Sequence, residues 1–367
     1  MLIKSVICVH LWLISAFIFF SLLDMKMLRK MICNAAVCIG RMVTGTPSVP
    51  PEIRRILAVV HGGIGDRLMT LPALRFLREK YADAVMHVVW CGEALPVEGE
   101  FNSMEVVGKN DLFGQLRIMR KEWDLLFVNS IGAHSAVTEI ASAFSGISLR
   151  IGPMRVEGGI SAYNHAYYVP HNEHVTAINM TAASGERYTH PFPYPIKTLS
   201  HNVEKESFVL LHVGCRPAYK GYEKNRWPLE NFRKLAVKIQ SEMKKKVVVI
   251  IGPDEEFMKE KVGKWGVEIV RHLSLKELFE IICKANLLIG NDSGPSHIAA
   301  AVGTPEIILF GPSDPRRSAP VSDKAVMICA GHEEPFYKYE KLPEYVLRSM
   351  EMIKVETVFT AVKEVLK

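Results

Sequence analysis

Short apolar runs alternate with helical patterns along most of this chain. The first run covers residues 56–60, and after a glycine-rich turn the spacing of the leucines over 68–81 predicts a helix. Further apolar runs follow at 85–90 and 125–128. Because these runs are continuously apolar, they predict parallel strands that helices cover on both faces. We therefore expect the first part of the chain to form a Rossmann-like domain.

The second half of the chain repeats this scheme. Its apolar runs predict strands at 208–213, 247–251, 287–289 and 307–310. Between about 155 and 205 the pattern dissolves into Tyr, His, Asn and Pro, so we place the domain boundary there. The expected fold is α/β, with two doubly wound domains at 54–190 and 200–350 facing each other across a cleft and a closing helix at 351–367.

The first 53 residues differ in character from the rest of the chain. From Ser5 to Leu23 there is neither an acid nor a permanent base, and this length is about one bilayer crossing. One lysine precedes the stretch and four basic residues follow it before residue 42, which predicts a single-pass anchor with the C-terminal bulk in the cytoplasm. A Pro-rich linker at 44–54 follows. The alternative is that translation starts at Met25, Met27 or Met31.

Composition narrows the class of protein. A chain of 367 residues that is 49% hydrophobic can bury two cores, and a net charge of +6 does not demand a nucleic-acid partner. An acidic phospholipid or phosphorylated glycolipid surface is equally compatible with that charge. The seven cysteines are scattered and lack CxxC spacing, which indicates reduced, buried thiols in a cytosolic compartment and no structural metal site.

The first candidate site is the glycine-rich turn between the strand at 56–60 and the next helix. Gly62, Gly63 and Gly65 would let a ligand approach the backbone, and a helix N-terminus favours negative charge. The turn has neither GxGxxG spacing nor a Walker lysine, so it supports neither an NAD site nor a P-loop. Asp66 stands at the helix start, where spacing alone favours an N-cap over a site residue.

The second candidate site follows the strand at 287–289 and opens a helix. There the helix-start amides, the Ser293 hydroxyl and the Gly294 backbone would form a pocket for a diphosphate, and His297 could donate to a phosphate oxygen. The alternative makes Asp292 or Ser293 a helix cap and His297 a surface residue. Because several polar groups converge on one turn, we favour the anion site.

Two further loops carry candidate ligands. The loop at 214–228 would clamp a negatively charged leaving group with its basic residues, Arg216, Lys220, Lys224 and Arg226. In the turn at 251–256, a carboxylate such as that of Glu255 could accept hydrogen bonds from a ribose. A solvated basic loop and a turn with N-capping acids explain these two segments as well.

These motifs, in this order and at these separations, resemble glycosyltransferase family 9, the ADP-heptose:lipopolysaccharide heptosyltransferases. The resemblance covers about residues 54–367. Its most specific pieces are GGIGDRLMTLPALRFLREKY at 62–81, NDSGPSHIAAAVGTPEIILFGPSDPRR at 291–317 and RWP at 226–228. The resemblance implies the GT-B fold, in which the N-terminal domain binds the acceptor and the C-terminal domain binds the nucleotide-sugar donor.

Carried over by position, the resemblance implies that Asp66 is the general base at the acceptor hydroxyl, against the preference for a cap that spacing alone gives. It implies that the donor diphosphate loop is formed by Asp292, Ser293, Gly294 and His297. Glu255 takes the approximate place of a donor-contacting acid.

The chain departs from the family at two positions: Asn225 replaces the usual lysine before RWP, with Lys224 one residue earlier, and His61 replaces a common arginine.

The resemblance therefore implies an inverting transfer of a heptose from ADP-heptose to a lipopolysaccharide core or related glycan acceptor, at the inner face of the cytoplasmic membrane. No Asp-x-Asp triplet occurs in the chain, which fits a mechanism without metal or cofactor. We expect closure of the two domains about a hinge at 170–205 to exclude water from the donor. The alternatives are a GT-B transferase with another nucleotide sugar and a non-catalytic nucleotide-sugar-binding module.

Overall fold

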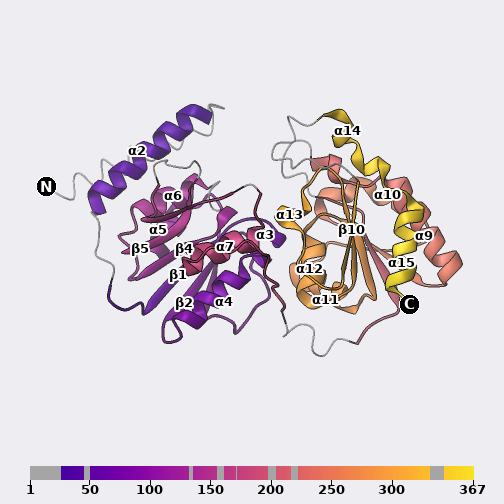
Figure 1. Ribbon diagram of the computed structural model, residues 1–367, viewed down its shortest axis with the longest axis horizontal. Coiled ribbons are helices and arrows are strands. Elements are labelled where there is room, and N and C mark those ends of the chain that lie inside the picture. Colours follow the sequence, from indigo (N-terminus) through magenta and orange to yellow (C-terminus); the bar gives the residue numbers. More distant parts are fainter. Residues whose placement is uncertain are drawn as a thin grey trace.

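The structure is a computed structural model of two α/β lobes that lie side by side (Figure 1). It describes residues 26–44, 50–131, 135–154, 161–170, 172–196, 204–215, 222–330 and 343–367. We call residues 26–184 the first lobe, 185–196 the linking segment and 204–367 the second lobe.

The first lobe is built on a six-stranded parallel sheet with the order β3-β2-β1-β4-β5-β6, which is the Rossmann order. The strands are β1 (Arg55–Val60), β2 (Val85–Cys91), β3 (Ser103–Val107), β4 (Leu125–Val128), β5 (Leu149–Met154) and β6 (His165–Tyr168). The central strand β1 pairs with β2 and β4 in register, so that Ile56 lies between Met86 and Leu125. The carboxyl ends of β1 and β4 form the switch point where ligands bind in such sheets.

Helices cover both faces of this sheet, which is why its central strands are continuously apolar. Ile56, Ala58 and Val60 pack in one core with α4 (Leu71–Lys80) and α7 (Val175–Ser184). Leu57 and Val59 point to the other face, against α5 (Leu112–Met119) and α6 (Ala136–Ala143). The short helix α3 (Ile64–Leu68) follows β1 directly. The helix expected at 68–81 is confirmed as α4, although it begins at Leu71 and not at Leu68, which ends α3; Pro72 lies in the first turn of α4, where proline is tolerated.

An additional helix, α2 (Lys26–Thr44), packs on the outside of the first lobe against α6 (Figure 1). Its buried residues are Cys33, Ala36 and Val37, and Gly40 comes so close to α6 that a Cβ there would lie 2.9 Å from the Cβ of Ala143. The apolar stretch Ser5–Leu23, expected to be an anchor, lies outside the described residues. Within the described ranges, no helix has the length and apolar character needed to cross a membrane.

The second lobe repeats the Rossmann order with six parallel strands, β12-β11-β10-β7-β8-β9. Its strands are β7 (Phe208–His212), β8 (Lys246–Ile251), β9 (Glu268–Arg271), β10 (Leu287–Asn291), β11 (Glu306–Phe310) and β12 (Ala325–Cys329). Its helices are η2 (Tyr222–Asn225), α9 (Leu229–Met243), η3 (Pro253–Met258), α10 (Lys259–Gly263), α11 (Leu275–Lys284), α12 (Gly294–Val302), α13 (Pro315–Ser318), α14 (Glu344–Leu347), η5 (Ser349–Met352) and α15 (Val355–Val365). The closing helix α15 packs on α9 and stays with this lobe.

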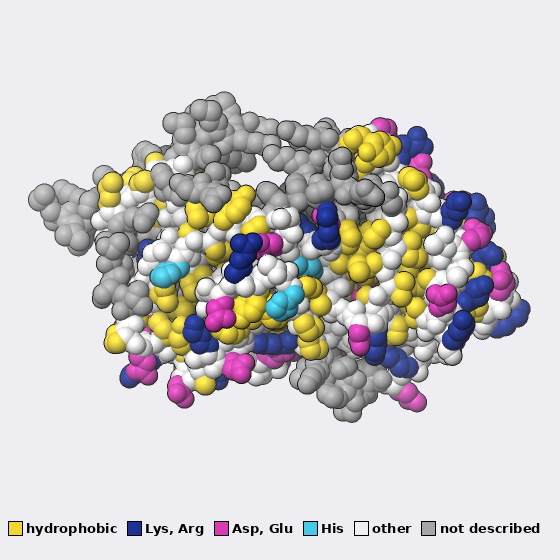
Figure 2. Space-filling view, in the orientation of Figure 1, with side chains coloured by type: hydrophobic (Ala, Val, Ile, Leu, Met, Phe, Trp, Pro, Cys, Tyr) yellow, Lys and Arg dark blue, Asp and Glu magenta, His cyan; other side chains and the backbone are white. Residues whose placement is uncertain are grey.

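The charge on the outer surface of the second lobe is locally balanced. On the face shown in Figure 2, basic side chains near α9 are interspersed with acidic ones. On α9 itself Arg233 pairs with Glu230 and Lys238 pairs with Glu242. This face therefore carries both signs of charge side by side.

Two expectations from the sequence are corrected by the fold. The region between 155 and 205, expected to be irregular and to hold the hinge, contains β6 and the helix α7, which packs on α4. Its signal is weak because β6 is only four residues long and α7 is mainly small and apolar, without a polar face. Six free cysteines are described, and the expectation that they are buried fails for Cys38, which is half-buried, and for Cys329, which is exposed on edge strand β12.

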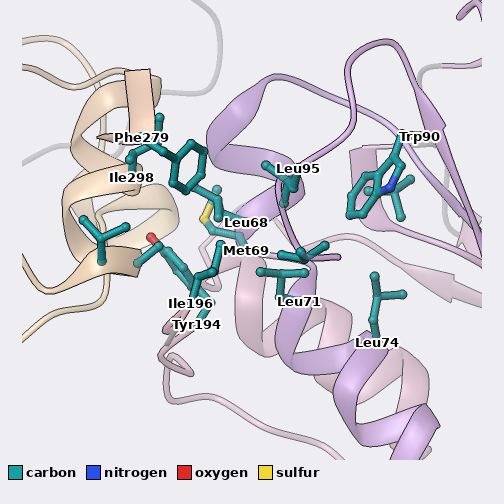
Figure 3. Close-up of a cluster of buried hydrophobic side chains, with 14 of the residues drawn as sticks. Leu68, Met69, Leu71, Leu74, Trp90, Leu95, Tyr194, Ile196, Phe279 and Ile298 are labelled. Carbon is teal, nitrogen blue, oxygen red and sulfur yellow. The ribbon is translucent and has the colours of Figure 1, made fainter. Parts of the chain in front are cut away.

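The two lobes meet through α3 and α12, and their cores are continuous there. Figure 3 shows Leu68 and Met69, at the end of α3, beside Phe279 of α11 and Ile298 of α12. Tyr194 and Ile196 of the linking segment complete this shared cluster. Two hydrogen bonds add to it: Arg317 donates to the Pro170 carbonyl at 2.8 Å, and His174 Nε2 lies 2.9 Å from the Ala319 carbonyl.

Candidate functional site

Asp66 lies at the carboxyl end of β1, in the first turn of α3. Its Oδ2 accepts a hydrogen bond from the backbone N–H of Gly63 at 2.8 Å, so the side chain closes the start of the helix from its third position. Gly62 has φ +106°, and a side chain there would collide with the Asp66 carboxylate. Asp66 thus stabilises the turn, but one carboxylate oxygen suffices for that bond and the other is left for chemistry.

A buried polar network holds the glycine turn against β4. Asn129, just after β4, accepts from the backbone N–H of His61 at 2.9 Å and donates to the His61 carbonyl at 3.0 Å. Thr70 donates its hydroxyl to the Asp66 carbonyl at 2.8 Å and accepts from Asn129. The His61 ring itself turns inward to Thr138, at 2.7 Å, and burial lowers the pKa of this imidazole to about 4. His61 is therefore neutral near pH 7 and does not supply the positive charge of an arginine.

The second lobe repeats this arrangement with Asn291 at the end of β10. Its side chain accepts from the Trp227 N–H and donates to the Gly214 carbonyl, both at 2.9 Å, so it joins the ends of β7 and β10 to the start of α9. Ser293 begins α12, but its hydroxyl bonds to the Asn291 carbonyl and the His212 ring rather than to the helix amides. The N-terminus of α12 consequently has no side-chain cap and can receive an anion.

Asp66 and Asp292 lie within electrostatic range of each other where α3 meets α12. Burial and the Asp66 carboxylate raise the pKa of Asp292 to about 6. Burial also raises the pKa of Asp66, against the opposing effects of the Gly63 amide and of Arg67, Arg317 and Lys109. The two helices approach closely: a Cβ added to Gly294 of α12 would lie 3.1 Å from the Cβ of Ile64 on α3. The structure therefore brings the two predicted motifs together, although they are more than 200 residues apart.

His297 is buried in this contact rather than exposed on the helix surface. Its Nδ1 lies 2.8 Å from the hydroxyl of Tyr194, in the linking segment, and its ring lies against Gly65 of α3. Burial lowers the pKa of this imidazole to about 3. Any hydrogen bond from His297 to a phosphate would therefore come from a neutral ring.

Glu255 lies at the carboxyl end of β8 with its carboxylate packed against Gly214 and Gly252. Arg226 binds it at 3.6 Å and also donates to the Cys215 carbonyl at 2.9 Å. Burial raises the pKa of Glu255, and Arg226 opposes this effect. The two residues thus form an internal pair beside the end of β7, where the nucleoside end of a donor is expected in this fold.

The remaining basic residues of the 214–228 loop are less well placed. Lys224 belongs to η2 and lies within electrostatic range of Glu351 on η5, away from the α12 N-terminus. Asn225, at the position of the usual lysine, is buried. Arg216 and Lys220 lie outside the described residues.

Sequence reasoning missed three basic residues that surround Asp66. Lys109 follows β3, Arg67 is on α3 and Arg317 is on α13, and all three act on the Asp66 carboxylate. Arg317 was quoted within the NDSGPSH segment, but nothing in its spacing indicated that it reaches the opposite lobe. Lys109 belongs to no recognisable motif. Its place near Asp66 follows only from the pairing of β2 and β3, which the sequence around Lys109 does not indicate.

The sequence was then compared with known proteins. The family model described as "Glycosyltransferase family 9 (heptosyltransferase)" matches residues 132–345, more than half of the 367-residue chain. The chain belongs to glycosyltransferase family 9. The donor-loop motif lies within the matched residues of this glycosyltransferase, whereas Asp66 precedes them.

Curated relatives of this family 9 member are heptosyltransferases. Lipopolysaccharide heptosyltransferase 2 of Escherichia coli K12 is 24% identical over 310 residues, which cover 75% of this chain and 87% of that protein. Lipooligosaccharide heptosyltransferase 2 of Haemophilus influenzae is 30% identical over 123 residues, 32% of this chain and 36% of that protein.

Solved structures show the same fold. The ADP-heptose lipopolysaccharide heptosyltransferase II of E. coli has a TM-score of 0.66 at 19% identity, covering 85% of this chain and 98% of its own. The family 9 glycosyltransferase of Veillonella parvula has a TM-score of 0.65 at 18% identity, covering 87% and 99%. The predicted fold class, two Rossmann-like parallel sheets in the GT-B arrangement, is confirmed.

Proposed function

We propose that this glycosyltransferase moves a heptose from ADP-heptose to a lipopolysaccharide core or related glycan acceptor, with inversion at the anomeric carbon and Asp66 as general base. The observation that carries this proposal is the position of Asp66 opposite the uncapped N-terminus of α12, across the contact between the lobes. A base and an anion site on opposite lobes are what a direct displacement between two substrates requires.

In this mechanism each lobe has one task. Asp66 takes the proton of the acceptor hydroxyl as that oxygen attacks the anomeric carbon, and the bond to the diphosphate breaks on the opposite side. The amides at the start of α12 then stabilise the charge on the departing nucleoside diphosphate, as a helix N-terminus does for anions generally. The burial that raises the pKa of Asp66 makes it a stronger base than a solvated carboxylate.

The choice of ADP-heptose is supported by the neighbours in the fold. E. coli heptosyltransferase WaaC, solved with ADP and with ADP-2-deoxy-2-fluoro heptose, matches with TM-scores of 0.64 and 0.60 at 15% and 16% identity. We further propose that the acceptor is a glycolipid and that the enzyme works on the cytoplasmic side of the membrane that holds it. The pair formed by Glu255, at the end of β8, and Arg226 is the proposed contact to the donor ribose.

We also propose that transfer needs no metal ion or cofactor, because the helix amides already neutralise the leaving group. Among the described residues, no group of three or more His, Cys, Asp or Glu is placed to hold a metal. One neighbour in the fold, TibC of E. coli, is described as iron-containing, at a TM-score of 0.55 and 12% identity, so this point needs a direct test. Transfer should persist in excess chelator, and a loss of activity that magnesium, manganese or iron restores would contradict the proposal.

The donor is tested by calorimetric titration of the full chain with ADP-heptose, UDP-N-acetylglucosamine and ADP. We expect ADP-heptose and ADP to bind and the UDP sugar not to bind. Binding of the UDP sugar alone would replace heptose by another donor while keeping the GT-B site. Binding without transfer to any glycan acceptor would favour a non-catalytic nucleotide-sugar-binding module.

A further inference from the structure

The pair formed by Tyr194 and His297 is not explained by the proposed roles of Asp66 and the α12 amides. Both side chains are almost fully buried, at 1% and 4% exposure, and the Tyr194 hydroxyl lies 2.8 Å from His297 Nδ1. The two rings also stack, with centroids 6.2 Å apart. Tyr194 comes from the linking segment and His297 from the donor helix, more than 100 residues later. The pair therefore joins the connection between the lobes to the candidate diphosphate site.

The surroundings of Tyr194 decide which atom donates in this bond. Burial raises the pKa of the Tyr194 phenol well above its usual 10, so the hydroxyl keeps its proton. The phenol proton must then go to an acceptor, and among the described residues that acceptor is His297 Nδ1. A neutral imidazole whose Nδ1 accepts carries its proton on Nε2.

The other ring nitrogen of His297 faces α3. A Cβ on Gly65 would lie 2.8 Å from Nε2 and 2.5 Å from Cδ2, so the absence of a side chain at this position makes room for the ring edge. Within the described part of the chain, Nε2 makes no hydrogen bond. Gly65, which this ring edge contacts, directly precedes Asp66 in the sequence, and His297 itself lies one helical turn after Gly294.

We propose that Tyr194 is a positioning residue that fixes His297 as the Nε2–H tautomer, so that a neutral imidazole donates one hydrogen bond to the diphosphate of the donor. This inference rests on the proposed function, since it names the ligand by the donor's chemistry. The bond between Tyr194 and Nδ1 acts as the outer hydrogen bonds of metal-bound histidines do, by setting both the tautomer and the orientation of the ring. Without it, the ring would exchange between tautomers, and the Nδ1–H form would present a lone pair to an anion.

The first test reads the tautomer directly. Full-length protein labelled with ¹⁵N-histidine contains 13 histidines, and the His297 signals are identified as those lost in His297→Gln. Long-range ¹H–¹⁵N correlation should show His297 protonated on Nε2 and not on Nδ1, and Tyr194→Phe should produce a mixture of the two. Protonation on Nδ1 in the unaltered protein, or an unchanged pattern in Tyr194→Phe, would overturn the proposal. The measurement on the unaltered protein decides the matter even if the variant does not fold.

The second test uses ADP as the ligand and a matched control. Tyr167→Phe removes another tyrosine hydroxyl, which donates to the Val128 carbonyl at 2.9 Å within the first lobe and does not contact His297. The dissociation constant for ADP should rise about tenfold in Tyr194→Phe, as for the loss of one hydrogen bond to a charged group, and stay within about twofold in Tyr167→Phe. If the dissociation constant for ADP rose equally in both variants, Tyr194 would contribute only through packing, and the proposal would be overturned. If the unaltered protein binds no ADP, the proposed function fails, and the tautomer still shows whether Tyr194 positions His297.

Discussion

The carboxylate of Asp66 holds the start of α3, and the proposed function gives it a second task as general base. It accepts the Gly63 N–H that starts α3, and it faces the donor loop from a partly buried position. A residue that only stabilised the helix would affect folding when altered, whereas a general base affects the chemical step. The two tasks can therefore be separated by a substitution that keeps the hydrogen bond to Gly63.

Asp66→Asn is such a substitution, because an amide oxygen can still accept from Gly63. We expect transfer to fall at least about 1,000-fold in kcat, since the base is lost, while the dissociation constant of ADP changes less than about threefold. Single-turnover kinetics and calorimetry measure the two quantities. An equal loss of binding and transfer would move Asp66 from the chemistry to the fold of the turn.

Residue spacing drew attention to the segments around Asp66 and 292–297, because each follows an apolar strand and opens a helix, but it favoured a cap at Asp66, and the role of base came from the family resemblance. It could not find Tyr194 or Arg317, whose partners are on the opposite lobe. It also could not show that His61 turns toward Thr138 or that His297 is buried, because both depend on a neighbouring helix that is distant in sequence. Local patterns thus indicated the candidate segments, and packing between the lobes sets the state of their side chains.

At the scale of elements, the weakest sequence signals belong to the edges of the sheets. The expected strands β1, β2, β4, β7, β8, β10 and β11 are central or lie one place from the centre, whereas the missed strands β3, β6, β9 and β12 are the four edge strands. Strands β3, β6 and β9 carry polar residues that interrupt their apolar runs, whereas the sequence of β12, AVMIC, is apolar throughout and was missed although its pattern fits a strand. The fifth missed strand, β5, is interrupted by Arg150, Gly152 and Pro153.

Strand β11 begins with a carboxyl that has no partner. Glu306 is fully buried, and neither of its side-chain oxygens has a hydrogen bond within the described part of the chain. Burial raises the pKa of Glu306 well above its usual 4.5. The folded state therefore binds a proton that the unfolded state releases, so stability is full below about pH 4.5 and falls as pH rises toward the folded pKa.

Glu306→Gln removes this ionisation while keeping the shape of the side chain. The variant should be more stable than the unaltered protein at pH 7, by up to about 3 kcal/mol, and equally stable at pH 4. Urea unfolding at both pH values measures the difference, with the exposed Glu260→Gln as a control that should change neither. A stability difference that is the same at both pH values would show that the carboxyl is not the cause.

Helix α2 depends on one glycine for its contact with α6. Gly40→Leu would place a side chain where only 2.9 Å separates a Cβ from Ala143, so α2 should detach from the first lobe. Limited proteolysis should then cleave between α2 and β1 faster than in the unaltered chain. Met42→Leu, at a residue that is 82% exposed, is the control and should leave cleavage unchanged. Unaltered cleavage in Gly40→Leu would mean that α2 does not need this close approach.

At the scale of the whole molecule, the two lobes share one hydrophobic cluster, and each lobe has a further core of its own on the other face of its sheet. Leu68 is fully buried in the part of this cluster where α3 meets α11 and α12 (Figure 3). Unfolding one lobe would expose the apolar surface that the other lobe buries in this cluster. The two lobes should therefore unfold together in a single calorimetric transition.

Leu68→Asp tests this coupling by placing a charge in the shared cluster. The single transition should separate into two, because the buried charge favours lobes that are apart. The control is Leu116→Asp, in the core on the other face of the first sheet. It should lower the melting temperature of the first lobe while leaving the contact around Leu68 intact. A single transition in Leu68→Asp would show that other contacts, such as those of His174 and Arg317, are sufficient.

The close fit of His297 against Gly65 also sets how fast a donor can enter. Because the ring edge occupies the space beside α3, a diphosphate that enters between α3 and α12 would require these helices to separate first. Entry then follows opening, so the observed association rate should level off at high nucleotide concentration, at the rate of opening itself. The fraction of time spent open reduces the apparent affinity by the same factor. Gly65, which lets α3 and α12 meet, would in this way make the rate at which the two lobes open the upper limit on turnover.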